Sequence, residues 1–285
     1  MTILSWNCRG LGQPRTVQEL VCLVHTHKPK LVFLTETRQN NKYVTNLKWR
    51  LGLRHCITQP GTVKGAAIAL FYDESVEIKK ISVGTRYIDV LIRLNPHGPQ
   101  WRGTFVYGEP KAHKRHHMWS LLSRIKDTSN LPSLMTGDFN ETMWQSEHYS
   151  VTKRSERYMR NFREALSECN LFDLGFKGSG WTYNNKQQGN NNVRARLDRF
   201  VASPTWSNLF TNALMEHIFS SKSDHLPILL RMGARKEWRL VEQTKESMFR
   251  YEQMWERVES LQPTITASWG RSGPVGNLRM IGEKL

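Results

Sequence analysis

The sequence lacks the features that mark secreted, membrane-spanning and zinc-binding proteins. Its four cysteines, Cys8, Cys22, Cys56 and Cys169, form no Cys-x-x-Cys pair, so we expect free thiols in a reducing compartment rather than disulfides or a zinc site. No apolar run approaches the roughly 20 residues of a membrane span, and the amino terminus lacks the basic and apolar regions of a signal peptide. We therefore expect an intracellular protein, nuclear or cytoplasmic, with no membrane partner.

Acidic residues are scarce relative to basic ones. The 285 residues include 41 Lys and Arg against 25 Asp and Glu, a formal net charge of +16, and residues 1–232 carry +14 of this net charge. A basic globular body is typical of proteins that bind a polyanion such as DNA, and solubility charge alone is the alternative explanation. No feature of the sequence indicates an obligate protein partner.

Hydrophobic residues are plentiful enough for a packed core: they make up 39% of the chain, which includes 10 Trp and 11 Phe. Apolar runs bounded by turn residues predict strands, and apolar residues at helical spacing predict helices between them. The predicted strands cover 2–6, 31–34, 66–72, 76–83, 87–94, 101–107, 133–140, 194–201, 212–219 and a last run ending at 230, and the helices cover about 17–24, 112–126, 155–169 and 204–210. This order predicts an α/β fold, a four-layer α/β sandwich in which two mainly antiparallel sheets pack together and are flanked by helices.

The chain divides into one large domain and a carboxyl-terminal extension. The core domain is expected to cover 1–232 and to close at Met232. Apolar residues at helical spacing, from Trp238 to Val258, predict an amphipathic helical extension over 233–261. Residues 262–285 are rich in Gly and Pro and are expected to form a flexible tail.

Polar residues follow several of the predicted strands directly. In Gly137-Asp138-Phe139-Asn140 a buried strand ends, and alternation places Asp138 and Asn140 on one face. Such a tetrapeptide is also common where a strand simply turns. The other polar residues beside apolar runs are Asn7, Glu36, Tyr107, Asp198, Asp224 and His225. Together they supply what phosphodiester hydrolysis needs: carboxylates for a hard divalent cation, a base for water, and donors for developing charge.

Six ordered motifs carry a resemblance to a known family. They are Ser-Trp-Asn-Cys-Arg-Gly-Leu (5–11), Thr-Glu-Thr (35–37), Val-Tyr-Gly (106–108), Gly-Asp-Phe-Asn (137–140), Arg-Leu-Asp-Arg (196–199) and Ser-Asp-His-Leu-Pro-Ile (223–228). In order and spacing they resemble the endonuclease/exonuclease/phosphatase superfamily. The chain looks most like the apurinic-type endonuclease domain of plant LINE-type non-LTR retrotransposons, over about residues 1–232.

The resemblance implies a role for each matching residue. Glu36 would be the principal Mg²⁺ ligand, with Mn²⁺ as the alternative ion, and Asn7 and Asp224 would lie beside the metal. Asp138 and Asn140 would handle the attacking water. Tyr107 would donate to the scissile phosphate, and His225, with its tautomer fixed by Asp198, would stabilise the phosphate or act as the base. The resemblance leaves open whether Asp138 or His225 takes the proton.

Two departures from the family pattern concern DNA. Some family members carry an acid where this chain has Arg9, which weakens the case for a second metal there. The usual aromatic-Thr-Trp-Ser-Asn segment reads Trp181-Thr182-Tyr183-Asn184-Asn185 here, so we expect Thr182 to lie in a surface hairpin that enters a DNA groove. The residues predicted to contact DNA are Arg9, Trp181, Thr182, Lys186, Arg194 and Arg196.

The sequence therefore predicts a Mg²⁺-dependent endonuclease that nicks DNA and leaves a 3′-hydroxyl to prime reverse transcription. Within the superfamily, the alternative is a phosphatase of phosphoinositides or small phosphate esters. A second alternative, of another class, is a decayed domain that binds nucleic acid without cutting it.

Overall fold

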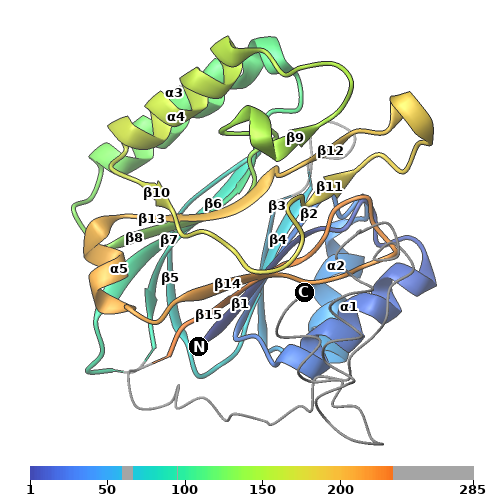
Figure 1. Cartoon of the computed structure of the whole chain (residues 1–285). Helices are drawn as coiled ribbons and strands as arrows, with labels where there is room; N and C mark the ends of the chain where they lie inside the picture. Colours follow the sequence, from blue (N-terminus) through green and yellow to red (C-terminus); the bar gives the residue numbers. More distant parts are fainter. Residues whose placement is uncertain (60–66, 95, 234–285) are drawn as a thin grey trace, which may run out of the picture. The chain divides into compact units, whose positions relative to one another are not determined.

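Two six-stranded sheets form the centre of the computed structural model, which describes residues 1–59, 67–94 and 96–233 (Figure 1). The first sheet has the order β14 (Leu214–His217), β15 (Ile228–Arg231), β1 (Thr2–Asn7), β2 (Leu31–Thr35), β4 (Ile68–Tyr72), β3 (His55–Gln59). The second has the order β10 (Phe172–Asp173), β13 (Asp198–Ala202), β8 (Ser133–Asp138), β7 (Gln100–Tyr107), β6 (Tyr87–Arg93), β5 (Glu77–Gly84). A small third sheet joins β11 (Tyr183–Asn184), β12 (Arg194–Ala195) and β9 (His148–Tyr149).

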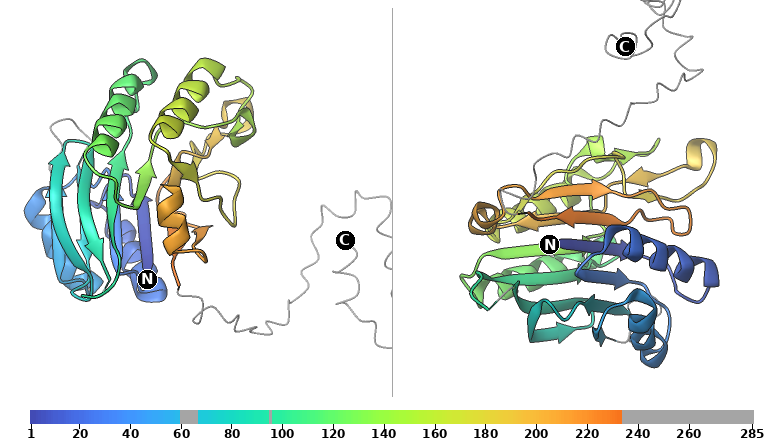
Figure 2. Two further views of the ribbon diagram at one scale, coloured as in Figure 1. Left: turned by 90° about the vertical axis from the view of Figure 1, so that its left-hand side faces the viewer. Right: turned by 90° about the horizontal axis from the view of Figure 1, so that it is seen from below.

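Helices cover the outer faces of both sheets, as the two further views show (Figure 2). The helices α1 (Pro14–His27) and α2 (Asn41–Leu51) pack on the first sheet, and α3 (Arg115–Asp127) and α4 (Glu156–Glu168) pack on the second. A short helix, α5 (Pro204–Leu209), follows β13, and single 3₁₀ turns occur at Ala112–Lys114, Gln145–Glu147 and Gly189–Asn191. In the described part of the chain, no helix is long and apolar enough to cross a bilayer.

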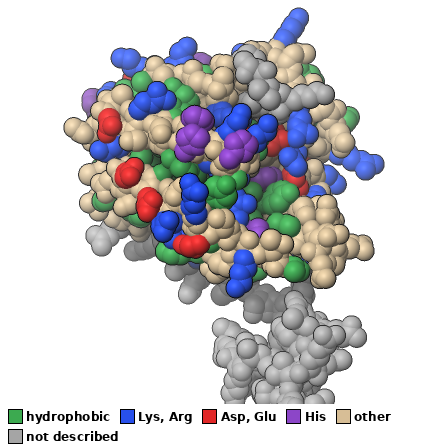
Figure 3. Space-filling model, turned by 90° about the horizontal axis from the view of Figure 1, so that it is seen from above, with side chains coloured by type: hydrophobic (Ala, Val, Ile, Leu, Met, Phe, Trp, Pro, Cys, Tyr) green, Lys and Arg blue, Asp and Glu red, His purple; other side chains and the backbone are tan. Residues whose placement is uncertain are grey.

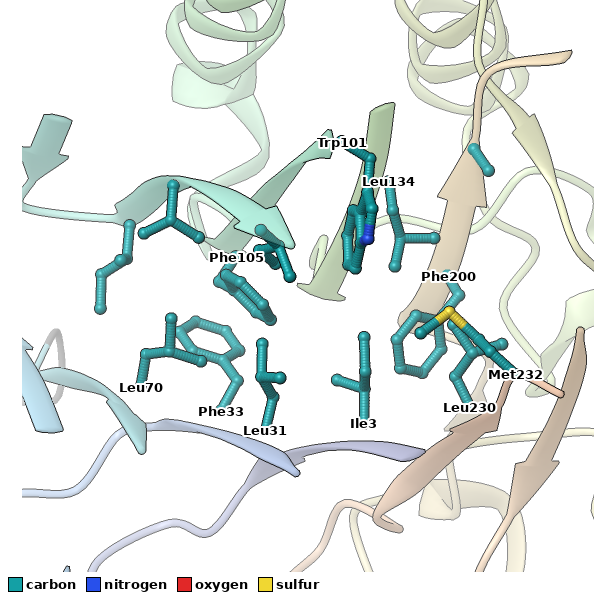
Figure 4. Packing of buried hydrophobic residues seen from close by; sticks show 14 of the residues in the cluster. Ile3, Leu31, Phe33, Leu70, Trp101, Phe105, Leu134, Phe200, Leu230 and Met232 are labelled. Atoms are coloured by element: carbon teal, nitrogen blue, oxygen red, sulfur yellow. The ribbon is translucent and has the colours of Figure 1, made fainter. Parts of the chain in front are cut away.

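Successive side chains of the central strands point to opposite faces of the sheet, so each strand contributes both to the core between the sheets and to the core under the helices. In β1, Ile3 points into the space between the sheets, whereas Leu4 and Trp6 point toward the helices. Figure 4 shows Ile3 and Phe33 of the first sheet facing Phe105 of the second across this inner core. Because both faces of each central strand are buried, the strands read in the sequence as continuous apolar runs.

The predicted four-layer sandwich is confirmed, and the two sheets are mixed. The pairs β1–β2 and β7–β8 are parallel, and the other strand pairs within the two six-stranded sheets are antiparallel. The expected strand over 194–201 is two strands, β12 and β13, which belong to different sheets. The helix α2 and the strand β3 were not predicted. The predicted helical extension and tail fall on residues 234–285, outside the described residues.

Candidate active site

The strand register brings the predicted site residues to one edge of the two sheets, which faces upward in Figure 1. Because β1 and β2 are parallel, Asn7 is paired with Thr35, and Glu36 follows directly. Likewise β7 and β8 are parallel, so Tyr107 is level with Asp138. The antiparallel strand β13 begins opposite Asp138, with Asp198 as its register partner. Residues far apart in the chain therefore reach the same edge through strand pairing alone.

Glu36 is a carboxylate at the wall of this edge, with polar partners on both oxygens. Its Oε1 accepts a hydrogen bond from Asn7 Nδ2 at 3.0 Å and another from the Tyr107 hydroxyl at 3.0 Å. Arg38 donates to Oε2, and the Arg9 guanidinium lies 3.5 Å from Oε1. Burial alone raises the pKa of Glu36, but these donors and the charge on Arg9 outweigh it, so the net pKa is lowered. Glu36 is therefore held as an anion.

Asp138 is a fully buried carboxylate held by two donors. Asn7 Nδ2 donates to Oδ2 at 3.0 Å, and the backbone N–H of Asn140 donates to Oδ1 at 2.8 Å. Burial raises the pKa of Asp138 to about 7, with Asp198 adding to the shift while His225 opposes it. Such a carboxyl is a stronger base than an exposed aspartate and still ionises near neutral pH. Asn140 has a positive φ of 57°, and its side chain donates to the Gly108 carbonyl at 3.1 Å.

His225 and Asp198 form a buried pair next to Asp138. His225 Nδ1 lies 2.8 Å from Asp198 Oδ2, and Nε2 lies 3.8 Å from Asp138 Oδ2. Burial lowers the pKa of His225, but the negative charges of Asp198 and Asp138 outweigh it and raise the pKa to about 9. The imidazole is therefore a cation at neutral pH, and its Nδ1 hydrogen bond to Asp198 fixes the ring.

Main-chain contacts from neighbouring residues hold His225 in place. Trp6 Nε1 donates to the His225 carbonyl at 3.0 Å, and the Ser223 hydroxyl accepts the His225 N–H at 3.1 Å. The same hydroxyl donates to the Asn7 carbonyl at 2.7 Å. The loop before β15, which carries His225, is thereby tied to the end of β1, which carries Asn7.

A cleft of about 240 Å³ opens above these groups. Glu36, Tyr107, Asn140 and His225 line one part of it, and the other lining residues are Arg9, Pro110, Arg115, Thr142, His148, Arg154, Tyr183, Val193, Ala195 and Leu197. Seen from this side, Lys and Arg side chains are spread across the surface, and His side chains lie near its middle (Figure 3). The cleft thus joins the buried polar groups to a basic surface, which suits an anionic substrate.

Asp224, which the sequence analysis placed beside the metal, is linked to Glu36 by ion pairs with Arg9. The Arg9 guanidinium lies 2.7 Å from Asp224 Oδ2 as well as 3.5 Å from Glu36 Oε1. Arg9 has a positive φ of 51° and a side chain that is 42% exposed, so it faces the cleft. The Arg9 guanidinium therefore bridges the two carboxylates.

Oxygen donors at this place fit a divalent metal ion. The buried carboxylate of Glu36 lines the cleft, and a hard cation such as Mg²⁺ is commonly bound through one or two carboxylates together with water and substrate oxygens. Asp138, Asp198 and His225 also lie within 4.8 Å of one another. Within this group, His225 Nδ1 is already hydrogen-bonded to Asp198 Oδ2, whereas the Glu36 carboxylate lines the cleft.

Three of the residues predicted to contact DNA lie on the surface beside the cleft. Lys186 is exposed, with a positive φ of 58°, and its Nζ donates to the Ser221 carbonyl at 3.1 Å. The Arg194 guanidinium lies over the Trp181 ring, 4.7 Å from its centroid. Trp181 and Arg194 are half-buried and belong to the hairpin region that contains β11 and β12.

Two other predicted DNA contacts are buried, contrary to the sequence-based prediction. Thr182 is 0% exposed, and its hydroxyl accepts the backbone N–H groups of Leu197 and Asp198 at 2.9 and 3.0 Å. Arg196 is 4% exposed and forms ion pairs with Glu147 at 3.1 Å and Asp173 at 2.7 Å. Thr182 therefore supports the start of β13, and Arg196 pairs with two partly buried acids, so neither side chain is exposed on the surface.

The sequence analysis missed a second wall of the cleft. Glu141 is fully buried and is paired with Arg115 and with Arg154, whose Nε lies 2.8 Å from Glu141 Oε1. Arg115 lies at the start of α3. The only sequence feature that indicates this wall is the acidic residue Glu141 directly after Gly-Asp-Phe-Asn. Its partners Arg115 and Arg154 are 26 and 13 residues away in the sequence.

Comparisons with known proteins agree with this geometry. The family model described as the endonuclease/exonuclease/phosphatase family matches residues 4–225. No curated protein matches by sequence. Similar solved structures include the endonuclease domain of TRAS1, a telomere-specific non-LTR retrotransposon, at 16% identity and a TM-score of 0.62, covering 82% of this chain and 99% of that domain.

Two further solved structures are similar to the same extent. An AP endonuclease from Archaeoglobus fulgidus has 16% identity and a TM-score of 0.66, with 82% of this chain and 100% of that chain covered. The 3′ phosphatase NExo from Neisseria, bound to a product DNA hairpin, has 17% identity and a TM-score of 0.64, again with 82% and 100% covered. At these identities the structures establish the fold, whereas the family model spans most of the chain. The chain belongs to the endonuclease/exonuclease/phosphatase family.

Proposed function

We propose that this protein is a Mg²⁺-dependent endonuclease that nicks one strand of DNA and leaves a 3′-hydroxyl. The observation that carries the proposal is the cleft in which Glu36, held as an anion, lies beside Asp138 and the His225–Asp198 pair. A phosphodiester placed there meets a metal ligand, a base and a cationic donor at once.

The metal would be held by Glu36, with Asp224 and Asn7 beside it. When bound, it would supply Lewis-acid stabilisation of the charge that develops on the scissile phosphate. Asn7 donates to both Glu36 and Asp138, so it keeps the two carboxylates in a fixed relation. Tyr107 keeps its proton because burial raises its pKa, and its single O–H, which donates to Glu36 here, would turn away from Glu36 to donate to a phosphate oxygen.

The two titrating groups divide the proton transfers between them. His225 is protonated at neutral pH because its pKa is raised to about 9, so it can donate from Nε2 to a phosphate oxygen but cannot accept a proton. Asp138, with a pKa raised to about 7, is then the group that orients the attacking water and takes its proton. Asn140 keeps the Asp138 carboxylate in place through its backbone N–H. We therefore assign the base to Asp138 rather than to His225.

DNA is the proposed substrate because the cleft opens on a basic surface. Arg9, Lys186, Arg194 and Trp181 lie beside it, and the net charge of +16 favours a polyanion over a small ester. The comparison with the TRAS1 endonuclease domain supports target-site nicking of the retrotransposon type. Phosphate contacts of this kind position DNA without selecting a sequence.

A nicking assay tests the proposal. Supercoiled plasmid with Mg²⁺ is incubated with the wild type, with Glu36→Ala and Asp138→Ala, and with Asp127→Ala as a control that removes an exposed carboxylate at the end of α3. We expect open circles from the wild type and the control, and none from the two site variants.

Two outcomes would refute the proposal in different ways. Faster release of phosphate from small esters than nicking would make the protein a phosphatase. Salt-sensitive retention of DNA with no nicking by the wild type would make it a binding domain.

A further inference from the structure

A second cavity, of about 620 Å³, lies beside the catalytic cleft and is larger than it. It is enclosed by the segment 179–186, which contains β11, and by the loop 219–226 that leads to β15. Figure 1 shows this loop next to β11, on the side away from α3 and α4. Its apolar lining comes mainly from Trp181, Phe219 and Leu226, and the polar groups include Lys186 and Asp224.

The two walls of this cavity are bonded to each other. The Asn184 N–H donates to the Asp224 carbonyl at 2.8 Å, and the Leu226 N–H donates to the Thr182 carbonyl at 2.6 Å. Lys186 Nζ adds a contact to the Ser221 carbonyl at 3.1 Å. The cavity is therefore present before any ligand arrives, so binding costs little ordering of the chain.

Aromatic surface at the cavity is open to solvent. Phe219 is 82% exposed, the largest exposure among the large hydrophobic side chains of the described residues. Trp181 is held by Arg194 over one ring face and by the Tyr149 ring edge, with centroids 5.8 Å apart. An exposed phenylalanine on a loop and a fixed tryptophan on the facing segment form a site for a planar apolar group.

The charged residues around the cavity indicate which kind of planar ligand it binds. Lys186 at the rim is exposed, and Arg194 is bound to the Trp181 ring, so a ligand that carries phosphate is favoured over an apolar peptide. Asp224 lines the cavity, and Arg9 joins it to Glu36 through contacts of 2.7 and 3.5 Å. One guanidinium group thus links Asp224, which lines the cavity, to Glu36, which lines the catalytic cleft.

We propose that this cavity receives an unpaired nucleobase of the DNA, next to the phosphate that is cut, and that Phe219 and Trp181 stack on it. The inference rests on the proposed function, and it specifies the substrate as DNA with a nucleotide outside the duplex stack. Stacking on aromatic side chains suits any base, so the cavity selects DNA structure rather than sequence.

Binding without metal tests the inference separately from cleavage. Fluorescence anisotropy in EDTA compares a labelled, fully paired duplex with the same duplex carrying one unpaired adenine, for the wild type, for Phe219→Ala and for Phe172→Ala. Phe172 is the matched control because it is exposed on β10 and lines neither cavity. Phe219 is so exposed that its substitution leaves the core unchanged, and a thermal melt verifies this.

The wild type and Phe172→Ala are expected to bind the duplex with the unpaired adenine about tenfold more tightly than the paired one. Phe219→Ala should lose most of this preference and keep its affinity for paired DNA. Equal affinity of the wild type for both duplexes would overturn the inference, as would an equal loss on both duplexes in Phe219→Ala. A change in oligomeric state in Phe219→Ala would show that a second copy of the chain covers the cavity, and would also overturn it. If the wild type nicks DNA but binds both duplexes equally well, the proposed function stands although this inference fails.

Discussion

Replacing Asp198 with asparagine tests the ion pair that keeps His225 charged. The asparagine keeps the size of the side chain but removes the negative charge that lies 2.8 Å from His225 Nδ1. Without it, burial lowers the pKa of His225 from about 9, and the charge of Asp138 still opposes this fall, so a larger share of the imidazole is neutral above neutral pH. A hydrogen bond to a charged group is worth about 1.5–3 kcal/mol, which corresponds to a loss of roughly 10- to 150-fold in kcat.

The loss of nicking activity in Asp198→Asn should depend on pH. Below about pH 6 the imidazole of Asp198→Asn regains part of its proton, so the nicking deficit should be smallest there and grow as the pH rises toward 9. Because the folded-state pKa of His225 lies above its unfolded value of 6.5, the stabilisation from its proton is full below pH 6.5 and is lost as the pH rises through about 9. The Tm difference between the wild type and Asp198→Asn should therefore be larger at pH 6 than at pH 9.5.

Initial rates of plasmid nicking across this pH range, together with NMR titration of the His225 ring, measure both effects. Asp89→Asn is the control, since Asp89 is equally buried but bonds Arg102 and Thr104 away from the cleft. A deficit in Asp198→Asn that stays constant with pH, or an unchanged His225 titration, would refute the assigned role of this pair.

Further substitutions separate residues that hold the fold from residues that meet DNA. Arg196→Met removes one of the two arginines that pair with Glu147 and Asp173 and leaves Arg199 with both, so it should lower the free energy of unfolding by about 1.5–3 kcal/mol in urea titrations; unchanged stability would contradict the ion network. Lys186→Ala should leave Tm unchanged but weaken DNA binding and reduce its salt dependence by about one phosphate contact, as anisotropy at several salt concentrations would show. Thr182→Val leaves two backbone N–H groups without an acceptor and should cost about 1–3 kcal/mol; a variant as stable as the wild type would mean that the hydroxyl does not hold β13.

The position of Glu36, Tyr107 and Asp138 at one edge could be predicted because each lies at the end of an apolar run. Parallel pairing of β1 with β2 and of β7 with β8 brings strand ends to one edge, so Glu36 and Asp138 meet wherever such a fold forms. The glycine before Asp138 is also explained by local structure. The φ of Gly137 is 143°, and a Cβ there would lie 1.9 Å from the Val106 carbonyl oxygen. That backbone requires glycine, and it carries Asp138 directly after it.

The burial of individual charged residues could not be predicted. Arg196 reads as an exposed residue of an alternating strand, but the chain leaves one sheet for another at Arg196–Leu197, and its partners lie 49 and 23 residues away. The contacts that bury it are long-range, and no local pattern encodes them. The helix α2 was missed although Val44, Leu47 and Leu51 have helical spacing, because its other positions are mostly polar.

The ends of the nicked strand test the central claim most directly. Plasmid treated with the wild type and Mg²⁺ is repurified and incubated with a DNA polymerase and labelled nucleotides, which extend only a free 3′-hydroxyl. The account predicts incorporation after treatment with the wild type, and none after treatment with Glu36→Gln or Asp138→Asn, which keep the size but not the charge of residues in the cleft. Nicks that the polymerase cannot extend, or nicks made equally well by both variants, would contradict it.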